Sequence, residues 1–294
     1  MPCPTSQYLS AMLIAAPLAP AGTVTEIEVP LLNELPYIEM TLSYLKDQGI
    51  PFEADFSGCF VLNGGYSYES FTSSVPADFS SAAFPAAAAA ITGGTVTLLG
   101  LDPQDTQGDK YFLEMLREMG CDINWRTTNL ENSITISRSG TLKGGSFDLN
   151  KTPDLLPAAA VVAAYADGDT TLTNVAHARI KETDRIAVMA QELAKLGVKC
   201  TEKPDGLIIH GKGCGKDSSY QVKSPNNSQY NNNAPSLPIV LEGHGDHRIV
   251  MALTVAALGG RLRGKAQSLV EITSAESAQV TYPEFFSMFM VNLG

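Results

Sequence analysis

The sequence predicts an α+β repeat fold in which apolar helices lie inside and sheets surround them. A pattern recurs along the 294 residues: a polar head, an Ala-rich apolar helix, a glycine stop and then usually a β-branched strand. A helix that is apolar on every side has to be buried, whereas a second helix in each repeat is amphipathic and half exposed. No GxGxxG sequence follows a predicted strand, which disfavours a Rossmann fold.

The apolar helices occur in four similar segments. They begin with Ser6, Asp78, Asp154 and Asp246, and the glycine stops lie near Gly22, Gly94, Gly168 and Gly260. The last interval is longer because it contains a Ser/Asn/Pro-rich stretch, KSPNNSQYNNNAPS, which is typical of a surface loop.

The second helix recurs as YIEMTLSYLKDQGI, KYFLEMLREMGCDI and RIAVMAQELAKLGVKC, with stops at Gly49, Gly120 and Gly197. Glycine suits this position because it adopts the left-handed conformation that ends many helices. The alternating runs CFVLNG, SITISR and GLIIHG follow and predict hairpin strands. The repeat is therefore helix–strand–helix–strand–strand, present three times and partly a fourth.

The charge and composition of the chain indicate which kinds of molecule it binds. The net charge is −11 and no Lys/Arg-rich run occurs, so we expect neither nucleic acid nor a membrane surface as a partner. A small anionic substrate needs only a few local cations. The first basic residue is Lys46, which argues against a signal peptide, and no apolar run reaches membrane-spanning length. We expect a cytoplasmic protein.

The five cysteines indicate neither disulfides nor a metal site. They are odd in number and scattered, and they form no CxxC pair and no Cys/His cluster: Cys3, Cys59, Cys121, Cys200 and Cys214. We expect free thiols in a reducing compartment.

The polar heads predict an anion site. If the repeats pack in parallel, several helix N-termini open on one side, where free N–H groups and helix dipoles attract an anion. In ARIKETDRIAVM, Lys181 and Arg185 stand four apart on a predicted helix, a like-charge pair that costs about 0.2–0.5 kcal/mol. Together with Arg248, these cations predict a phosphorylated or carboxylated ligand.

Simpler interpretations stay open for the same residues. Asp78, Asp154 and Ser6 are suitable helix caps. Glu182 and Asp184 are also explained as charges that balance a helix dipole. His177 and His247 have no partner visible in the sequence and suit a structural role equally well.

Separated motifs resemble those of the 5-enolpyruvylshikimate-3-phosphate synthase family, and the likeness extends through essentially the whole chain. The motifs are SQYLSAMLIAAPLA, PYIEMTL, QGD at Gln107–Asp109, the Pro153–Asp154 step, HARIKETDR and GDHRIVMAL. The KETDR-type segment separates this family from the related UDP-N-acetylglucosamine enolpyruvyl transferases.

The resemblance implies an inside-out α/β barrel fold of two domains, built from six βαβαββ units. Residues 1–74 then correspond to the C-terminal part of the first domain, which is incomplete, and residues 75–294 to the second. About one third of the family's chain, on the N-terminal side, has no counterpart. The implied activity is enolpyruvyl transfer from phosphoenolpyruvate to shikimate 3-phosphate, without a metal or organic cofactor.

The resemblance also implies roles for individual residues. Asp154 accepts the proton of the substrate hydroxyl, and Glu182 handles protons at the enolpyruvyl methylene. The implied contacts of shikimate 3-phosphate are Thr5, Ser6, Gln7, Tyr37, Asp154, His177 and Lys181. Those of phosphoenolpyruvate are Gln7, Arg185 and Arg248. Asp78 and Asp246 are further candidates.

Three positions depart from the family pattern. Glu34 replaces a frequent Ser that contacts the shikimate phosphate, and a carboxylate there would repel it. Val280 replaces a Lys that contacts phosphoenolpyruvate, and His177 replaces a common Asn.

Two other functions stay open: a transferase acting on a UDP-N-acetylglucosamine-type substrate, and a non-catalytic remnant that binds a ligand or a partner chain. We expect the chain alone to bind ligands weakly, to self-associate and to turn over little. The missing N-terminal segment, supplied as a separate chain, is a candidate partner.

Overall fold

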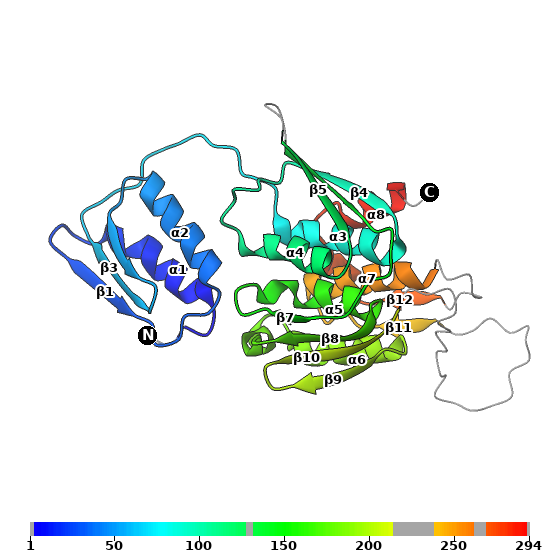
Figure 1. Cartoon of the computed structure of the whole chain (residues 1–294). Coiled ribbons are helices and arrows are strands. Elements are labelled where there is room, and N and C mark those ends of the chain that lie inside the picture. The colour runs from blue at the N-terminus through cyan, green and yellow to red at the C-terminus, as the bar shows by residue number, and fades with distance from the viewer. Residues whose placement is uncertain (1–2, 128–131, 214–237, 262–268, 293–294) are drawn as a thin grey trace, which may run out of the picture. The chain divides into compact units, whose positions relative to one another are not determined.

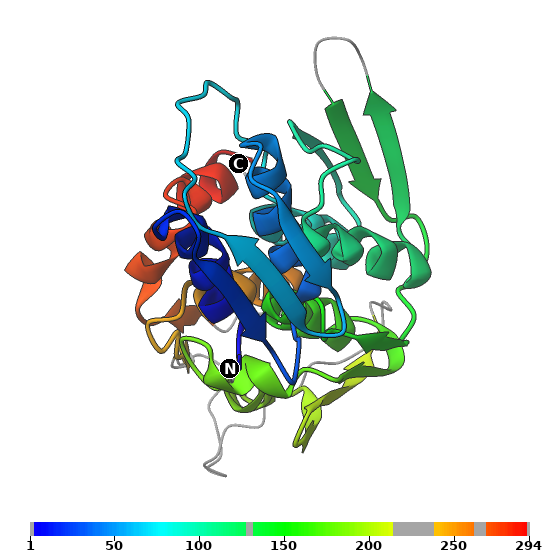
Figure 2. The ribbon, with the colours of Figure 1, turned by 90° about the vertical axis from the view of Figure 1, so that its left-hand side faces the viewer.

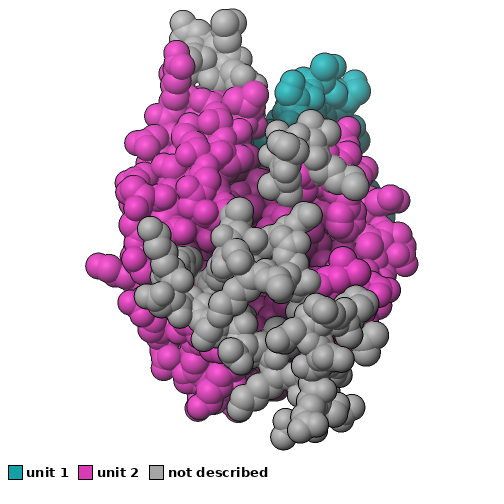
Figure 3. All heavy atoms as spheres, turned by 90° about the vertical axis from the view of Figure 1, so that its right-hand side faces the viewer, with its two compact units in different colours: residues 1–77, 102–108, 150–153 teal, residues 78–101, 109–149, 154–294 magenta. Residues whose placement is uncertain are grey.

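The computed structural model describes residues 3–127, 132–213, 238–261 and 269–292. The chain forms two compact units, coloured separately in Figure 3. Unit 1 comprises residues 1–77, 102–108 and 150–153, and unit 2 comprises residues 78–101, 109–149 and 154–294. The short segments 102–108 and 150–153 therefore belong to unit 1, although they lie beyond residue 74 in the sequence. The assignment of residues 1–74 and 75–294 to two family domains stays a prediction.

Unit 1 contains a single repeat. Its elements are α1 (Ser6–Ala15), a 3-10 turn (Ala16–Leu18), β1 (Val24–Glu28), α2 (Leu35–Asp47), β2 (Phe52–Asp55) and β3 (Cys59–Asn63). The strands form an antiparallel sheet in the order β1-β3-β2, and Figure 2 shows this sheet in front of the two helices. Leu9 and Leu13 of α1 pack with Ile38 of α2 and with Phe60 and Leu62 of β3.

The prediction that every first helix is buried is wrong for α1. Ser6, Leu9 and Leu13 are its only buried residues, whereas Tyr8, Met12 and Ile14 are 56%, 42% and 50% exposed. One face of α1 packs on α2 and the sheet, and within the described residues of unit 1 no further apolar helix covers the other face.

Unit 2 has its apolar helices inside, as the sequence predicts. The helices α3 (Phe79–Thr92), α5 (Leu156–Ala164) and α7 (His247–Arg261) pack against one another. Every residue of α5 is buried. Figure 1 shows these helices between strands above and below them.

The strands of unit 2 form several sheets around this helical core. One sheet is antiparallel and consists of β4 (Thr95–Leu99), β6 (Asn132–Ser137) and β5 (Asp122–Thr127), in that order. Another has the order β7-β8-β10-β9, with β7 (Ser146–Asp148), β8 (Asp167–Thr173), β10 (Gly206–Lys212) and β9 (Lys199–Lys203). The strands β11 (Ile239–Leu241) and β12 (Val270–Ile272) form a parallel pair. The hairpin strands predicted from SITISR and GLIIHG are confirmed as β6 and β10.

The second helices lie outside the helical core. They are α4 (Tyr111–Glu118), which contacts β5, and α6 (Arg185–Lys195), which contacts β9, while α8 (Phe285–Asn292) ends the described chain. The predicted glycine stops are confirmed, because Gly49, Gly120 and Gly197 all have positive φ angles. The described part of α7 ends at Arg261, next to the stop predicted near Gly260. The strand expected after α7 and the loop KSPNNSQYNNNAPS fall outside the described residues.

The prediction that a helix includes Lys181 is also wrong. Lys181 has an extended backbone, and α6 begins at Arg185 because the Asp184 carboxylate caps it, accepting a hydrogen bond from Ala187 N at 3.0 Å. In the described ranges, no helix is both long and apolar enough to cross a lipid bilayer.

Candidate active site

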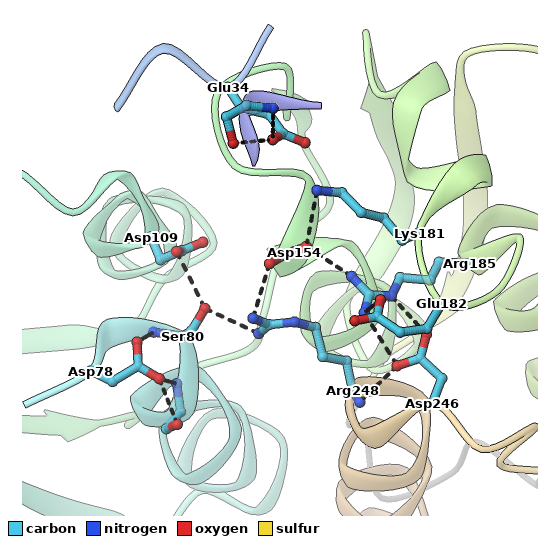
Figure 4. Close-up of polar contacts among 12 residues, drawn as sticks. Glu34, Asp78, Ser80, Asp109, Asp154, Lys181, Glu182, Arg185, Asp246 and Arg248 are labelled. Carbon is cyan, nitrogen blue, oxygen red and sulfur yellow. Dashed lines mark hydrogen bonds and ion pairs between the residues drawn. The ribbon is translucent and has the colours of Figure 1, made fainter. Parts of the chain in front are cut away.

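The N-termini of four helices meet in unit 2. Arg248 at the start of α7 donates to Ser80 Oγ at the start of α3, at 3.0 Å, and also contacts Asp154 Oδ2 just before α5, at 2.9 Å. Arg185, the first residue of α6, donates to Asp154 Oδ1 at 2.8 Å. Figure 4 shows these side chains pointing toward one another. The prediction that the polar heads open on one side is confirmed within unit 2.

Asp154 lies among three cations. Besides the two arginines, Lys181 Nζ is 3.9 Å from its Oδ1, and the carboxylate remains 18% exposed. Burial raises the pKa of Asp154, but Arg248, Arg185 and Lys181 outweigh it, so that this pKa lies below its ordinary value. Asp154 is not a helix cap, because the 3-10 turn Pro153–Leu155 precedes α5 and the N-cap residue is Leu155. Its oxygens therefore face the cations.

Arg185 is buried and fully engaged by carboxylates. Its side chain is 1% exposed, and Nε donates to Asp246 Oδ2 at 2.8 Å while Nη1 donates to Asp154. Nη2 donates to Glu182 and, at 3.3 Å, to Asp246 Oδ1. Burial lowers the pKa of Arg185, and the carboxylates Asp154, Asp246 and Glu182 more than compensate and raise it. The charge of Arg185 is thus balanced by carboxylates of the protein itself, and its contact with phosphoenolpyruvate stays a prediction.

Asp246 joins α6 to α7. Its Oδ1 accepts hydrogen bonds from Arg248 N at 2.9 Å and Ile249 N at 3.4 Å, so it caps α7. Its Oδ2 accepts from Arg185 Nε and from Thr183 Oγ1 at 3.0 Å. Burial raises the pKa of Asp246, which has no exposed surface, but the hydrogen bond and charge of Arg185 outweigh burial and lower it.

The remaining predicted residues of unit 2 differ in exposure. Glu182 is 49% exposed and Lys181 is 11% exposed. His247 is buried, and burial together with the charge of Arg248 lowers its pKa, which favours a neutral ring at pH 7. His177 is also buried, in the 3-10 turn Ala176–Ile180. Val280 is 77% exposed at the end of another 3-10 turn, Ala275–Val280.

Asp78 is a helix cap. Its carboxylate accepts hydrogen bonds from Ser80 N at 2.9 Å and Ser81 N at 3.0 Å, at the start of α3. The capping interpretation of Asp78 is confirmed.

Most of the predicted residues of unit 1 lie around one groove. Ser6, Gln7 and Tyr37 line a mainly apolar cavity of about 550 Å³ between α1, α2 and the segment that includes Tyr68. Thr5, the residue before α1, is buried. The amide and the hydroxyl of Ser6 both donate to Glu34.

Sequence reasoning missed Ser80, Asp109 and Thr183 as members of the cluster. Asp109 has no exposed surface and accepts a hydrogen bond from Ser80 Oγ at 3.2 Å. A signal was present, since Asp109 belongs to the QGD motif, but a short polar motif between a strand and a helix does not show what it faces.

In the described ranges, no group of three or more His, Cys, Asp or Glu side chains is arranged to hold a metal ion. Cys3, Cys59 and Cys200 are free thiols, and Cys214 lies outside those ranges.

Comparisons with known proteins agree with the fold and the motifs. The family described as EPSP synthase (3-phosphoshikimate 1-carboxyvinyltransferase) matches residues 4–289. The 3-phosphoshikimate 1-carboxyvinyltransferase of Ruminiclostridium cellulolyticum is 39% identical over 283 residues, which cover 96% of this chain and 59% of that protein. The enzyme of the same name from Methanothrix thermoacetophila is 41% identical over 282 residues, covering 96% and 58%.

A solved structure of EPSP synthase from Acinetobacter baumannii aligns with a TM-score of 0.71 at 30% identity, covering 99% of this chain and 61% of that one. The chain thus spans about three fifths of the length of the curated relatives that it matches. The predicted fold class is confirmed. These matches establish that the chain belongs to the EPSP synthase (3-phosphoshikimate 1-carboxyvinyltransferase) family.

Proposed function

We propose that the protein to which this chain belongs transfers the enolpyruvyl group from phosphoenolpyruvate to shikimate 3-phosphate and releases phosphate. The observation that supports this most is Asp154, an ionised carboxylate held between Arg185 and Arg248 where four helices begin. The relatives described above are named for this reaction.

The cluster suits a reaction that moves protons beside bound anions. An ionised carboxylate is a competent base, and Asp154 takes the proton from the attacking shikimate hydroxyl as its oxygen bonds to C2 of phosphoenolpyruvate. Glu182, half exposed and bonded to Arg185, protonates the methylene carbon and later removes a proton from the resulting methyl group as phosphate leaves. The hydroxyl proton held by Asp154 passes to the phosphate as it leaves. Glu182 regains the proton that it gave, so both carboxyl groups return to their starting states and the products are the enolpyruvyl ether and hydrogen phosphate.

The cations divide into two roles. Within the described residues Arg248 pairs with one carboxylate, Asp154, so some of its five N–H donors remain for ligand oxygens. Arg185 uses all three nitrogens on carboxylates, so it holds Asp154 and Glu182 in place and reaches phosphoenolpyruvate only if a carboxylate moves. In unit 2, shikimate 3-phosphate would contact Lys181 and His177.

We also propose that unit 1 acquires a polypeptide partner. In unit 2, three apolar helices bury one another, whereas α1 in unit 1 leaves Tyr8, Met12 and Ile14 exposed. Of these three, Ile14 lines the groove. A separate chain that corresponds to the N-terminal segment of the relatives would cover this face with helices of the same kind.

Calorimetric titration of the purified chain with phosphoenolpyruvate and with shikimate 3-phosphate tests substrate recognition. We expect weak binding of both, loss of phosphoenolpyruvate binding in Arg248→Ala, and no competition by UDP-N-acetylglucosamine. Arg126→Ala, at an exposed position in β5 of the same unit, is the matched control. Absence of shikimate 3-phosphate binding together with tight binding of UDP-N-acetylglucosamine would contradict the proposed acceptor.

Turnover is tested by phosphate release. We expect little release by the chain alone and measurable release when the N-terminal segment of a family member is added in trans. Binding without turnover in both mixtures would favour a non-catalytic role.

A further inference from the structure

Ser80 lies between Arg248 and a buried carboxylate. The residue is 6% exposed, and its hydroxyl is 3.0 Å from Arg248 Nη1 and 3.2 Å from Asp109 Oδ2. Figure 4 shows this line of contacts continuing from Arg248 to Asp154. The proposed reaction gives Ser80 and Asp109 no role of their own.

The chemistry of these groups fixes the direction of both hydrogen bonds. A guanidinium has donors and no acceptor, so Ser80 Oγ must accept from Arg248. The hydroxyl hydrogen is then available to Asp109, whose carboxylate accepts it. Asp109 therefore orients the hydroxyl so that its lone pairs face Arg248.

Arg248 is held at both terminal nitrogens. Ser80 accepts from Nη1, and Asp154 accepts from Nη2 at 2.9 Å. Two anchors on opposite corners of a planar group prevent rotation about the Nε–Cζ bond and restrict the swing of the side chain, which is only 13% exposed. A cation fixed in this way loses less conformational freedom when an anion binds.

The start of α3 supplies the hydroxyl at the right place. Asp78 caps this helix through the amides of Ser80 and Ser81, which fixes its first turn. The two serines then have different surroundings, because Ser81 Oγ returns to Asp78 Oδ2 at 2.6 Å while Ser80 Oγ points to Arg248. Ser81 is thus a matched control on the same turn.

We propose that Ser80 is a positioning residue that, oriented by Asp109, fixes the guanidinium of Arg248 for binding an anionic ligand. The identity of that ligand as phosphoenolpyruvate rests on the proposed function, whereas the immobilisation of Arg248 does not.

Nitrogen-15 NMR of the arginine Nε–H groups in the intact chain tests the immobilisation directly. The Arg248 signal is assigned by its loss in Arg248→Lys. We expect a rigid, slowly exchanging signal in the wild type and a mobile one in Ser80→Ala, with the Arg185 signal unchanged. Ser80→Thr, which keeps the hydroxyl, should restore rigidity, and Ser81→Ala should leave the signal as in the wild type. An equally rigid Arg248 in Ser80→Ala, or equal mobility in Ser81→Ala, would overturn the proposal.

Calorimetric titration with phosphoenolpyruvate tests the consequence for binding. Loss of a hydrogen bond to a charged group should raise the Kd about tenfold in Ser80→Ala, while Ser80→Thr and Ser81→Ala keep the wild-type affinity. If Ser80→Ala does not fold, Ser80→Cys keeps the side-chain volume and removes the hydroxyl, and the same loss is expected.

The two experiments separate the two proposals. A wild type that binds no phosphoenolpyruvate, yet loses Arg248 rigidity in Ser80→Ala, contradicts the proposed function and supports the positioning role. A wild type that binds phosphoenolpyruvate with the same Kd as Ser80→Ala contradicts the positioning role alone.

Discussion

Glu34 accepts two hydrogen bonds from Ser6 on one carboxylate oxygen, from the amide at 2.8 Å and from the hydroxyl at 2.6 Å. Glu34 is buried, with 1% of its surface exposed, and its φ of 57° places it in the left-handed region. A protein carboxylate therefore occupies the donors at the start of α1 that a ligand phosphate would otherwise use. A Ser residue at position 34 would leave them available.

Glu34→Gln should strengthen binding of shikimate 3-phosphate by up to about tenfold, because the amide no longer repels the phosphate. The same change should lower the free energy of unfolding by about 1 kcal/mol, since two charge-assisted hydrogen bonds become neutral. Calorimetric titration and chemical denaturation measure the two effects. Glu39→Gln, an exposed position on α2, is the control and should change neither. Unchanged or weaker binding in Glu34→Gln would show that Glu34 does not oppose the phosphate.

Asp246→Asn should destabilise the protein strongly. The substitution leaves Arg185, 1% exposed, without one of its carboxylates, and breaking a buried pair costs about 3–5 kcal/mol. Urea denaturation at neutral pH measures this loss. Asp122→Asn, at an exposed position in β5, should change the free energy of unfolding by less than about 0.5 kcal/mol. An equally small loss in Asp246→Asn would contradict a stabilising role for this pair.

Stability should fall in acid because of Asp154 and Asp246. Both carboxyls have a pKa below the ordinary value of about 3.9, so the unfolded chain binds their protons at a higher pH than the folded chain. Their contribution is complete above about pH 5 and is lost as the pH falls below 4 through the folded pKa values. Denaturation curves should be measured between about pH 7 and about pH 3, which covers the range in which carboxyl groups titrate. As the pH falls, the free energy of unfolding should decline less in Asp246→Asn than in the wild type. Parallel declines would contradict this assignment.

The sequence predicts the repeat well, because apolar and amphipathic helices and alternating strands follow from local periodicity. Prediction from the sequence fails where contacts between distant segments determine whether a helix is buried or where it begins. The composition of α1 resembles that of α5, yet α5 is wholly buried and α1 is half exposed, since burial depends on whether other helices are present to pack on it. The start of α6 was misplaced because Asp184 is a better cap than the residues before Lys181.

Part of the candidate site could be predicted and part could not. Lys181, Arg185 and Arg248 break simple rules of helix electrostatics or capping, so their chemistry stands out in the sequence. That Arg185 is enclosed by Asp154 and Asp246 as well as by its neighbour Glu182 could not be seen, because Asp154 and Asp246 are far from Arg185 in the sequence and reach it only in the folded chain. Ser80 looked like an ordinary first-turn residue for the same reason.

Asp154→Asn should separate binding from catalysis. The change removes a negative charge beside Arg248 and Lys181, so phosphoenolpyruvate should bind as tightly as before or more tightly. Phosphate release in the mixture complemented with the N-terminal segment should fall by about 10²-fold or more, the usual effect of losing a positioned base. Asp169→Asn, a 63% exposed position in β8, should alter neither quantity. A loss of tenfold or less at unchanged stability would count against Asp154 as the base.

Gly259→Ala should destabilise the contact between α5 and α7. An added Cβ would lie 2.4 Å from the ring of Tyr165, which is buried and donates its hydroxyl to Ala256 O at 2.6 Å. Overpacking of this kind costs about 1–3 kcal/mol, which exceeds the gain of about 0.5–1 kcal/mol from replacing a helical Gly by Ala. Thermal denaturation measures the balance. Gly140→Ala, where the added Cβ meets nothing within 4 Å, should have a much smaller effect, and a more stable Gly259→Ala protein would contradict the packing argument.

The exposed face of α1 should make the isolated chain self-associate. Met12 and Ile14 are apolar residues of α1 that remain 42% and 50% exposed in described unit 1, and exposed apolar side chains of this kind drive association in water. Sedimentation velocity should show a sedimentation coefficient that rises with protein concentration. The double variant Met12→Gln and Ile14→Gln should sediment as a monomer, because Gln removes the apolar surface and still favours a helix.

Val75→Gln removes an apolar residue that is 87% exposed outside α1, so it should associate like the wild type. A wild type that stays monomeric at every concentration, or equal suppression by Val75→Gln, would show that the α1 face is not the contact. Adding the N-terminal segment of a family member should compete with self-association, since both would use the same face of α1.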